Sequence, residues 1–257
     1  MPPKIFRSKP ENFPEKVAVC GGNVIPKNLL MGACRKRTEW VYNNLRTGII
    51  INTAIDYGEV VGQITALPLS SSPVEISGDG CWYVPCIWMV PKSASPLLGE
   101  KLLGSVVEDL KGKTSGILTL SSEQWMNHRS FLERFGFEEI SRIDRFDSKL
   151  DIMALRFGDE PIEIRIIERN PVLGAEPRLD LFYSSHCPVH VATAYRVSKE
   201  HKQFEKSVQL VVHNIDDRSI LERYGYSFAL ILNGKRDILH EYITGRSLGE
   251  ILKHESI

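Results

Sequence analysis

Long apolar runs are absent from this sequence of 257 residues. The longest, 84–90, is interrupted by Pro85 and is far shorter than the roughly 20 residues that cross a bilayer. The chain opens with MPPKIFRSKPENFPEK, which is charged and proline-rich and has no apolar segment behind it. We therefore expect no signal peptide, no membrane partner and a cytoplasmic location.

An excess of charge of one sign is also missing. Lysine plus arginine number 32, and aspartate plus glutamate also number 32. Proteins that bind nucleic acid or anionic membranes usually carry a surplus of basic residues. The neutral balance therefore predicts no nucleic-acid partner.

The five cysteines form no C-x-x-C pair, which excludes a zinc ribbon and a dithiol redox motif. Their odd number and irregular spacing favour free, mostly buried thiols in a reducing compartment. His186 and His190 lie four residues apart, as two metal ligands on one helix would, but no third ligand is apparent. We expect no metal site. The cysteines are Cys20, Cys34, Cys81, Cys86 and Cys187.

Alternating strand and helix patterns predict an α/β fold. The pattern restarts after Gly158-Asp159-Glu160-Pro161, so we expect two domains, 1–158 and 159–257. In the first we expect helices over 28–47, 99–111 and 123–135 and strands over 49–54, 60–66, 81–90, 117–120, 138–143 and 151–156. In the second we expect strands over 178–183, 208–213, 228–232 and 238–242 and helices from 188 to about 204, over 217–224 and over 247–253.

The loop 69–80 carries two acidic residues, Glu75 and Asp79. Such carboxylates are usually solvated, and the alternative is a general base that acts through water.

The most informative junction is C-I-W-M-V-P-K-S-A-S-P-L-L-G-E-K-L-L at 86–103, where a strand passes through a loop into a helix. The amino terminus of a helix offers unpaired N–H groups and a positive dipole end, which suit a pyrophosphate. Cys86 is a thiol near this junction, and its alternative is a small buried hydrophobe.

This junction resembles that of GNAT acetyltransferases, which reads roughly V-x-P-x-x-R-G-x-G-x-G-x-x-L-L. From Val90, the last glycine falls on Gly99 and the leucine pair on Leu102 and Leu103, and Gly136-Phe137 matches the family's Gly-Phe pair. The resemblance implies a mixed sheet with helices on both faces and acetyl-CoA as co-substrate. The binding residues that it implies are Trp88, Met89, Val90, Leu97, Leu98, Gly99, Glu100 and Lys101.

The junction departs from the family pattern at several positions. Ala94 stands at the arginine, Ser95 and Leu97 stand at two glycines, and Pro96 between them has no N–H. The family's usual general acid is a tyrosine four residues before the Gly-Phe glycine, and Leu132 stands there.

The second half resembles a thioredoxin-like domain, with Cys187-Pro188-Val189-His190 in place of a C-P-x-C turn. A helix start favours the thiolate form of a cysteine, whereas burial opposes it. The whole chain resembles GNAT proteins with a YoaP-type C-terminal domain, which implies His240 as a candidate partner of Cys187.

Two classes of function follow from these resemblances. One is an acetyl-CoA-dependent N-acetyltransferase with a small-molecule or peptide amine as acceptor and with Cys86, Cys187 and His240 as candidate catalytic residues. The other is a binding or regulatory protein on a degenerate GNAT fold. A monothiol redox role for Cys187 is a third interpretation, and neither the acceptor nor the oligomeric state follows from the sequence.

Overall fold

The computed structural model describes residues 3–12, 25–90, 96–122, 128–145, 148–172, 174 and 177–255. Within them the protein is a mixed α/β fold that divides into two compact units. The first unit takes in 41–72 and 76–166 with the N-terminal strand. The second takes in 73–75, helix α1 (Lys27–Leu45) up to Trp40, and the chain from 167 onward. Both units thus combine separate segments, and the expected boundary between 158 and 159 stays a prediction.

A mixed sheet of eight strands forms the first unit within the described ranges. The order is β1-β2-β3-β5-β7-β9-β8, and β6 also pairs with β3. Of these pairs, β5 with β7 is parallel and the others are antiparallel. The strands are β1 (Lys4–Arg7), β2 (Ile50–Asp56), β3 (Glu59–Pro68), β5 (Cys81–Tyr83), β6 (Ile87–Met89), β7 (Gly116–Ser121), β8 (Glu138–Arg145) and β9 (Ser148–Arg156). A separate short pair joins β4 (Ile76–Ser77) to β10 (Arg165–Ile166).

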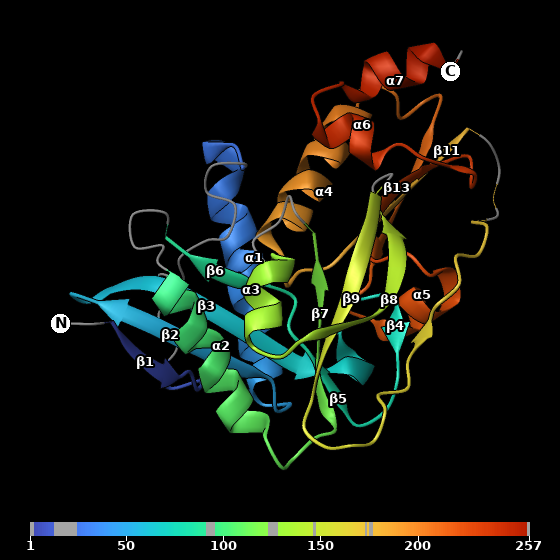
Figure 1. Cartoon of the computed structure of the whole chain (residues 1–257). Coiled ribbons are helices and arrows are strands. Elements are labelled where there is room, and N and C mark those ends of the chain that lie inside the picture. Colours follow the sequence, from blue (N-terminus) through green and yellow to red (C-terminus); the bar gives the residue numbers. More distant parts are fainter. Residues whose placement is uncertain are drawn as a thin grey trace. The chain divides into compact units, whose positions relative to one another are not determined.

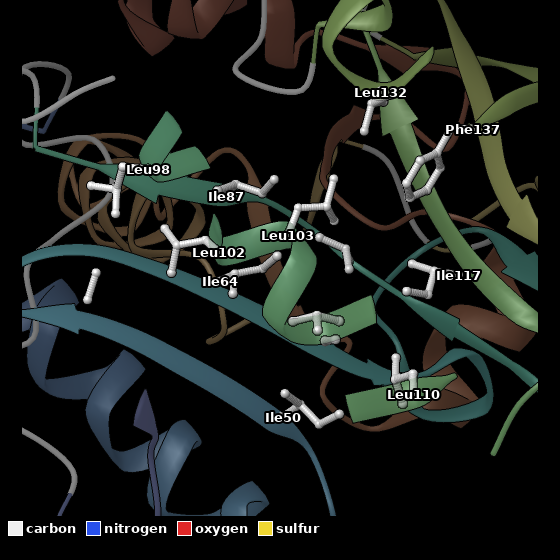
Figure 2. Packing of buried hydrophobic residues seen from close by; sticks show 14 of the residues in the cluster. Ile50, Ile64, Ile87, Leu98, Leu102, Leu103, Leu110, Ile117, Leu132 and Phe137 are labelled. Carbon is white, nitrogen blue, oxygen red and sulfur yellow. The ribbon is translucent and has the colours of Figure 1, made fainter. Parts of the chain in front are cut away.

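Helix α2 (Pro96–Leu110) crosses one face of this sheet (Figure 1). Figure 2 shows Leu98 and Leu102 of this helix in the same apolar cluster as Ile64 and Ile87 of the sheet. Leu132, on helix α3 (Arg129–Arg134), belongs to the same cluster. Each fully buried leucine contributes about 1.5–3 kcal/mol, so the start of α2 is fixed by its own apolar face.

The hairpin expected between 49 and 66 is confirmed as β2 and β3. The strand expected over 81–90 is wrong as one element: it is divided into β5 and β6, which both pair with β3, whereas only β5 also pairs with β7. Pro85 lies at the break and cannot donate to a ladder. The helix expected from Gly99 begins at Pro96, because proline is well suited to a first helical position. Residues 123–127 of another expected helix lie outside the described residues, and α3 follows them.

The second unit contains a four-stranded sheet in the order β12-β11-β13-β14. Strand β11 is parallel to β12 and antiparallel to β13, and β13 is antiparallel to β14. Its elements in chain order are β11 (Arg178–Tyr183), α4 (Pro188–His201), β12 (Gln209–Asn214), α5 (Arg218–Tyr224), β13 (Ala229–Leu232), β14 (Arg236–Asp237), α6 (Leu239–Ile243) and α7 (Leu248–His254).

Both faces of this second sheet are covered. Phe182 of β11 shares a cluster with Leu221 of α5, while its neighbour Leu181, which points to the opposite face, is also fully buried. The strand expected over 238–242 is wrong, because α6 occupies most of it. The Asp237 carboxylate, from the residue before the N-cap Ile238, accepts a hydrogen bond from the Leu239 N–H at 3.0 Å, which satisfies one N–H group at the start of the helix.

Within the described ranges, no helix has the length and apolar character needed to cross a membrane.

Candidate functional site

Strands β5 and β7 start side by side and then part. The Val84 N–H donates to the Leu118 carbonyl at 2.8 Å, whereas the Val84 carbonyl accepts from the Thr119 hydroxyl at 2.8 Å instead of from a backbone N–H. Beyond Pro85 the chain continues as β6 along β3, with Met89 opposite Gly62. The two parallel strands therefore lose their common ladder at this point.

This separation gives β6 an edge that does not face β3. The Val90 N–H donates to the Val61 carbonyl at 2.9 Å, so the backbone groups of Val90 and Trp88 point toward β3. Because such groups alternate along an antiparallel strand, the N–H and C=O of Met89 point away from β3. An edge of this kind can hydrogen-bond an extended ligand as if it were another strand.

The first turn of α2 is the second part of the candidate site. The first N–H groups of a helix have no intrahelical acceptor; since α2 begins at Pro96, which has no N–H, here they belong to Leu97 and Leu98. Leu97 is exposed and Leu98 is buried. The Glu100 and Lys101 amides lie within the helical hydrogen-bonding pattern, so these two residues offer their side chains instead.

Strand β6 and helix α3 meet at this turn. A Cβ atom on Gly99 would lie 3.5 Å from the Met89 Cε atom and 3.6 Å from the Phe131 ring, which are ordinary contacts. Gly99 therefore sits against both elements, although neither contact requires a glycine. The structure thus brings the first turn of α2 and Met89 together, and their binding of acetyl-CoA stays a prediction.

An ion pair links this turn to α3. The Arg134 Nη2 atom lies 3.5 Å from the Glu100 Oε1 atom, with side chains 59% and 36% exposed. The Arg134 guanidinium also lies 5.9 Å from the centre of the Phe131 ring. A surface pair of this kind stabilises the fold by about 0–1 kcal/mol.

Two other sequence candidates lie in the first unit. Cys86 is half-buried in the break between β5 and β6. Leu132 is 1% exposed inside the core, so this position supplies packing and no proton donor. Gly136 has a positive φ of 86° as the chain leaves α3, and Phe137 after it joins the same core, which explains the Gly-Phe pair.

A cavity of about 630 Å³ lies elsewhere in the first unit, near the starts of β5 and β7. Asp79, Cys81 and Glu163 are among its lining residues. Burial, followed by the nearby Asp79 charge, raises the pKa of the Cys81 thiol, which makes it a poor nucleophile at neutral pH. Because the cavity is at the other end of the parallel pair, it is distinct from the α2 junction.

The second unit holds an ordered turn at the start of α4. Cys187 occupies the N-cap position and Pro188 begins the helix. Before them, the Ser184 hydroxyl and the Ser185 N–H both donate to the Asp216 Oδ1 atom, at 2.7 Å and 3.0 Å. The turn that carries Cys187 is thus fixed to the end of β12.

These bonds also assign the proton on His186. A carboxylate has no proton to give, so Ser184 donates its only hydroxyl proton to Asp216. The Ser184 oxygen then accepts from the His186 Nδ1 atom, which lies 3.0 Å away. The neutral His186 ring therefore carries hydrogen on Nδ1 and its lone pair on Nε2.

Aromatic rings surround this turn. The His186 ring lies 5.9 Å from that of Trp40 and 5.7 Å from that of His190. His190 is stacked on Phe228 with ring centres 3.8 Å apart. His240 is exposed on α6. His190 is the third residue after the N-cap Cys187.

Glu75 is not the solvated carboxylate that we expected. It is 6% exposed, and its Oε1 atom accepts from the Ser227 hydroxyl at 2.7 Å and the Ser227 N–H at 3.3 Å. Its backbone carbonyl accepts from Ile167, and the carbonyl of Val74 accepts from Arg218. The segment 73–75 is therefore an integral part of the second unit, and this carboxylate has a structural role.

No group of three or more His, Cys, Asp or Glu side chains within the described ranges is arranged to hold a metal ion.

No protein-family model matches the sequence, and no curated protein matches it. Solved structures with a similar fold include the PaiA N-acetyltransferase from Thermoplasma acidophilum in complex with coenzyme A, at 15% identity and a TM-score of 0.46. The match covers 61% of this chain and 99% of that protein. A ribosomal-protein-alanine N-acetyltransferase from Brucella melitensis is 16% identical, with a TM-score of 0.45; the match covers 60% of this chain and 99% of that one. An N-acetyltransferase from Staphylococcus aureus Mu50 is 13% identical, with a TM-score of 0.43; the match covers 53% of this chain and 86% of that one.

Proposed function

We propose that the first unit is a GNAT-type domain that binds acetyl-CoA and transfers the acetyl group to an amine. The observation that carries this proposal is the outer edge of β6, next to the start of α2, which pairs with no other strand among the residues that the structure describes. The backbone of Met89 there faces away from β3 and can hydrogen-bond an extended chain of amides, such as pantetheine. Beside it, the amides of Leu97 and Leu98 suit a pyrophosphate.

In this reaction the amine nitrogen forms a bond to the acetyl carbon, and the carbon–sulfur bond of the thioester breaks. Coenzyme A leaves as a thiolate that takes up a proton, and the amine loses one. Since Leu132 is an apolar core residue, this chain contributes mainly orientation of the acetyl group and the amine. The acceptor is a small-molecule or peptide amine.

Titration of the full chain with acetyl-CoA in a calorimeter tests binding. We expect a saturable heat and a rise in melting temperature, because a ligand at 100 times its dissociation constant adds about 2.7 kcal/mol to stability. Adenosine triphosphate at equal concentration is the control for phosphate binding in general. Neither heat nor a thermal shift with saturating acetyl-CoA would contradict the proposal.

A second candidate is a binding or regulatory protein that holds acetyl-CoA without using it. The burial of Leu132 at the position of the family's general acid favours this candidate. Incubation with acetyl-CoA and a panel of primary amines separates the two, because transfer releases one coenzyme A thiol per product. Binding without thiol release above the rate without protein supports the regulatory role.

We propose that residues 159–257, most of which belong to the second unit, are a thioredoxin-like domain of the YoaP type. Its sheet order β12-β11-β13-β14 and the Cys187-Pro188 turn before α4 support this. The Asp216–Ser184–His186 chain of hydrogen bonds, which leaves a basic nitrogen on the residue before Cys187, favours a reactive monothiol. Cys187 would attack a small disulfide, form a mixed disulfide and release one thiolate.

A further inference from the structure

The candidate acetyl-CoA site is short of positive charge in its own loop. The arginine position of the GNAT pattern holds Ala94, and residues 91–95 contain one basic residue, Lys92. Glu100 follows the first turn of α2, and its carboxylate repels a phosphate. Lys92 and Lys101 are the basic residues close to this turn in sequence, and neither has the forked donors with which an arginine binds two phosphate oxygens.

Arg134 on α3 is next to that turn. Its guanidinium lies 3.5 Å from Glu100 and 5.9 Å from the centre of the Phe131 ring, and Phe131 in turn contacts the Gly99 position. The side chain is 59% exposed, so it can change partners without disturbing the core. Because an exposed pair with a carboxylate is weak, a doubly charged pyrophosphate competes for the guanidinium at little cost.

We propose that Arg134 is the phosphate-binding cation of this site, and that it exchanges Glu100 for the pyrophosphate of acetyl-CoA. The inference rests on the proposed acetyl-CoA binding. Arg134 neutralises Glu100 in the ligand-free protein, and it binds phosphate oxygens through its planar, forked donors in the complex. A cation on α3 thus takes over a role that the GNAT pattern gives to the loop.

Calorimetry on the full chain tests this with two ligands, acetyl-CoA and S-acetylpantetheine, which lacks phosphate. We expect Arg134→Gln to weaken acetyl-CoA at least tenfold and to leave S-acetylpantetheine within twofold. Arg134→Lys should recover part of the loss. Arg156→Gln is the matched control, because Arg156 also forms an exposed ion pair on this unit, with Glu138 at 2.7 Å. It should change neither affinity.

The outcomes separate the two proposals. If the wild type binds acetyl-CoA and Arg134→Gln binds it equally well, the role of Arg134 is refuted while acetyl-CoA binding stands. If Arg134→Gln weakens both ligands equally, the residue acts on the fold and the inference is refuted. If the wild type binds neither ligand, the proposed function and the inference fail together. Thermal unfolding of each variant shows whether it is folded.

Discussion

The backbone of Met89 allows a direct test of the open edge of β6. We predict that Met89→Pro weakens acetyl-CoA binding more than Met89→Ala does. Both variants remove the methionine side chain, but proline also removes the N–H that faces away from β3. The difference between the two variants therefore isolates one backbone donor.

The expected size follows from the energy of one hydrogen bond. An unmade bond to a desolvated ligand amide costs about 1–3 kcal/mol, and 1.4 kcal/mol corresponds to a factor of ten in affinity. We expect Met89→Pro to bind acetyl-CoA about 5- to 150-fold more weakly than Met89→Ala. Since the lost donor is not part of the ladder to β3, the two variants should differ little in stability.

Calorimetry with acetyl-CoA and urea unfolding of both variants provide the measurements. Trp88→Pro is a contrasting variant, because the Trp88 backbone faces β3 and its loss should destabilise the sheet. Equal acetyl-CoA affinities for Met89→Pro and Met89→Ala, in folded proteins, would refute the idea that the β6 edge binds the ligand.

Two further predictions concern the second unit. Asp180 is fully buried and accepts from Arg178 at 2.6 Å and from His213 at 2.7 Å; burial opposes its charge, but these bonds outweigh it and hold its pKa below the usual value. Asp180→Ala should therefore cost about 3–5 kcal/mol in urea unfolding of the second unit. The stabilisation by Asp180 is present above a pH of about 3.9, the pKa of an unfolded aspartate, and is lost as the pH falls through the lower pKa that Asp180 has in the folded protein. The variant should therefore lose this acid dependence of stability, and an unchanged pH profile would contradict the prediction. We also predict that Cys187 alkylates faster than the other four cysteines during brief iodoacetamide treatment at neutral pH, since burial raises the pKa of Cys34 and Cys81; mass spectrometry that places Cys187 among the slow thiols would end the redox interpretation.

Periodicity and turn residues predicted much of the fold. The hairpin of β2 and β3 follows from two apolar runs around Tyr57-Gly58, both of which have positive φ. Strand β11 agrees with the expected range 178–183, because it is an apolar run that ends in polar turn residues. These elements depend on residues that are close in sequence, so the sequence pattern alone predicts them.

Short elements and changes of partner were not predictable in the same way. Residues 81–90 read as one apolar strand, and Pro85 showed where a donor is missing. Only the tertiary structure shows that the pairing with β7 ends there while the pairing with β3 resumes in β6. Residues 238–242 are apolar enough for a strand, yet most of them form α6, where the Asp237 carboxylate accepts from the first helical N–H, that of Leu239. At both Pro85 and Asp237, the local secondary structure depends on one hydrogen-bonding group, and the apolar pattern alone does not distinguish the alternatives.

The candidate site shows the same division between local and distant information. The residues of β6 and the start of α2 are adjacent in sequence, and the resemblance to GNAT proteins identified them. Arg134 lies outside that stretch, and its pairing with Glu100 depends on how α3 packs beside the first turn of α2. Charge at a binding site is a property of the assembled surface, so a loop that lacks its arginine is not by itself evidence of lost binding. The cation must be sought among the neighbours of the loop in space, and Arg134 meets that condition.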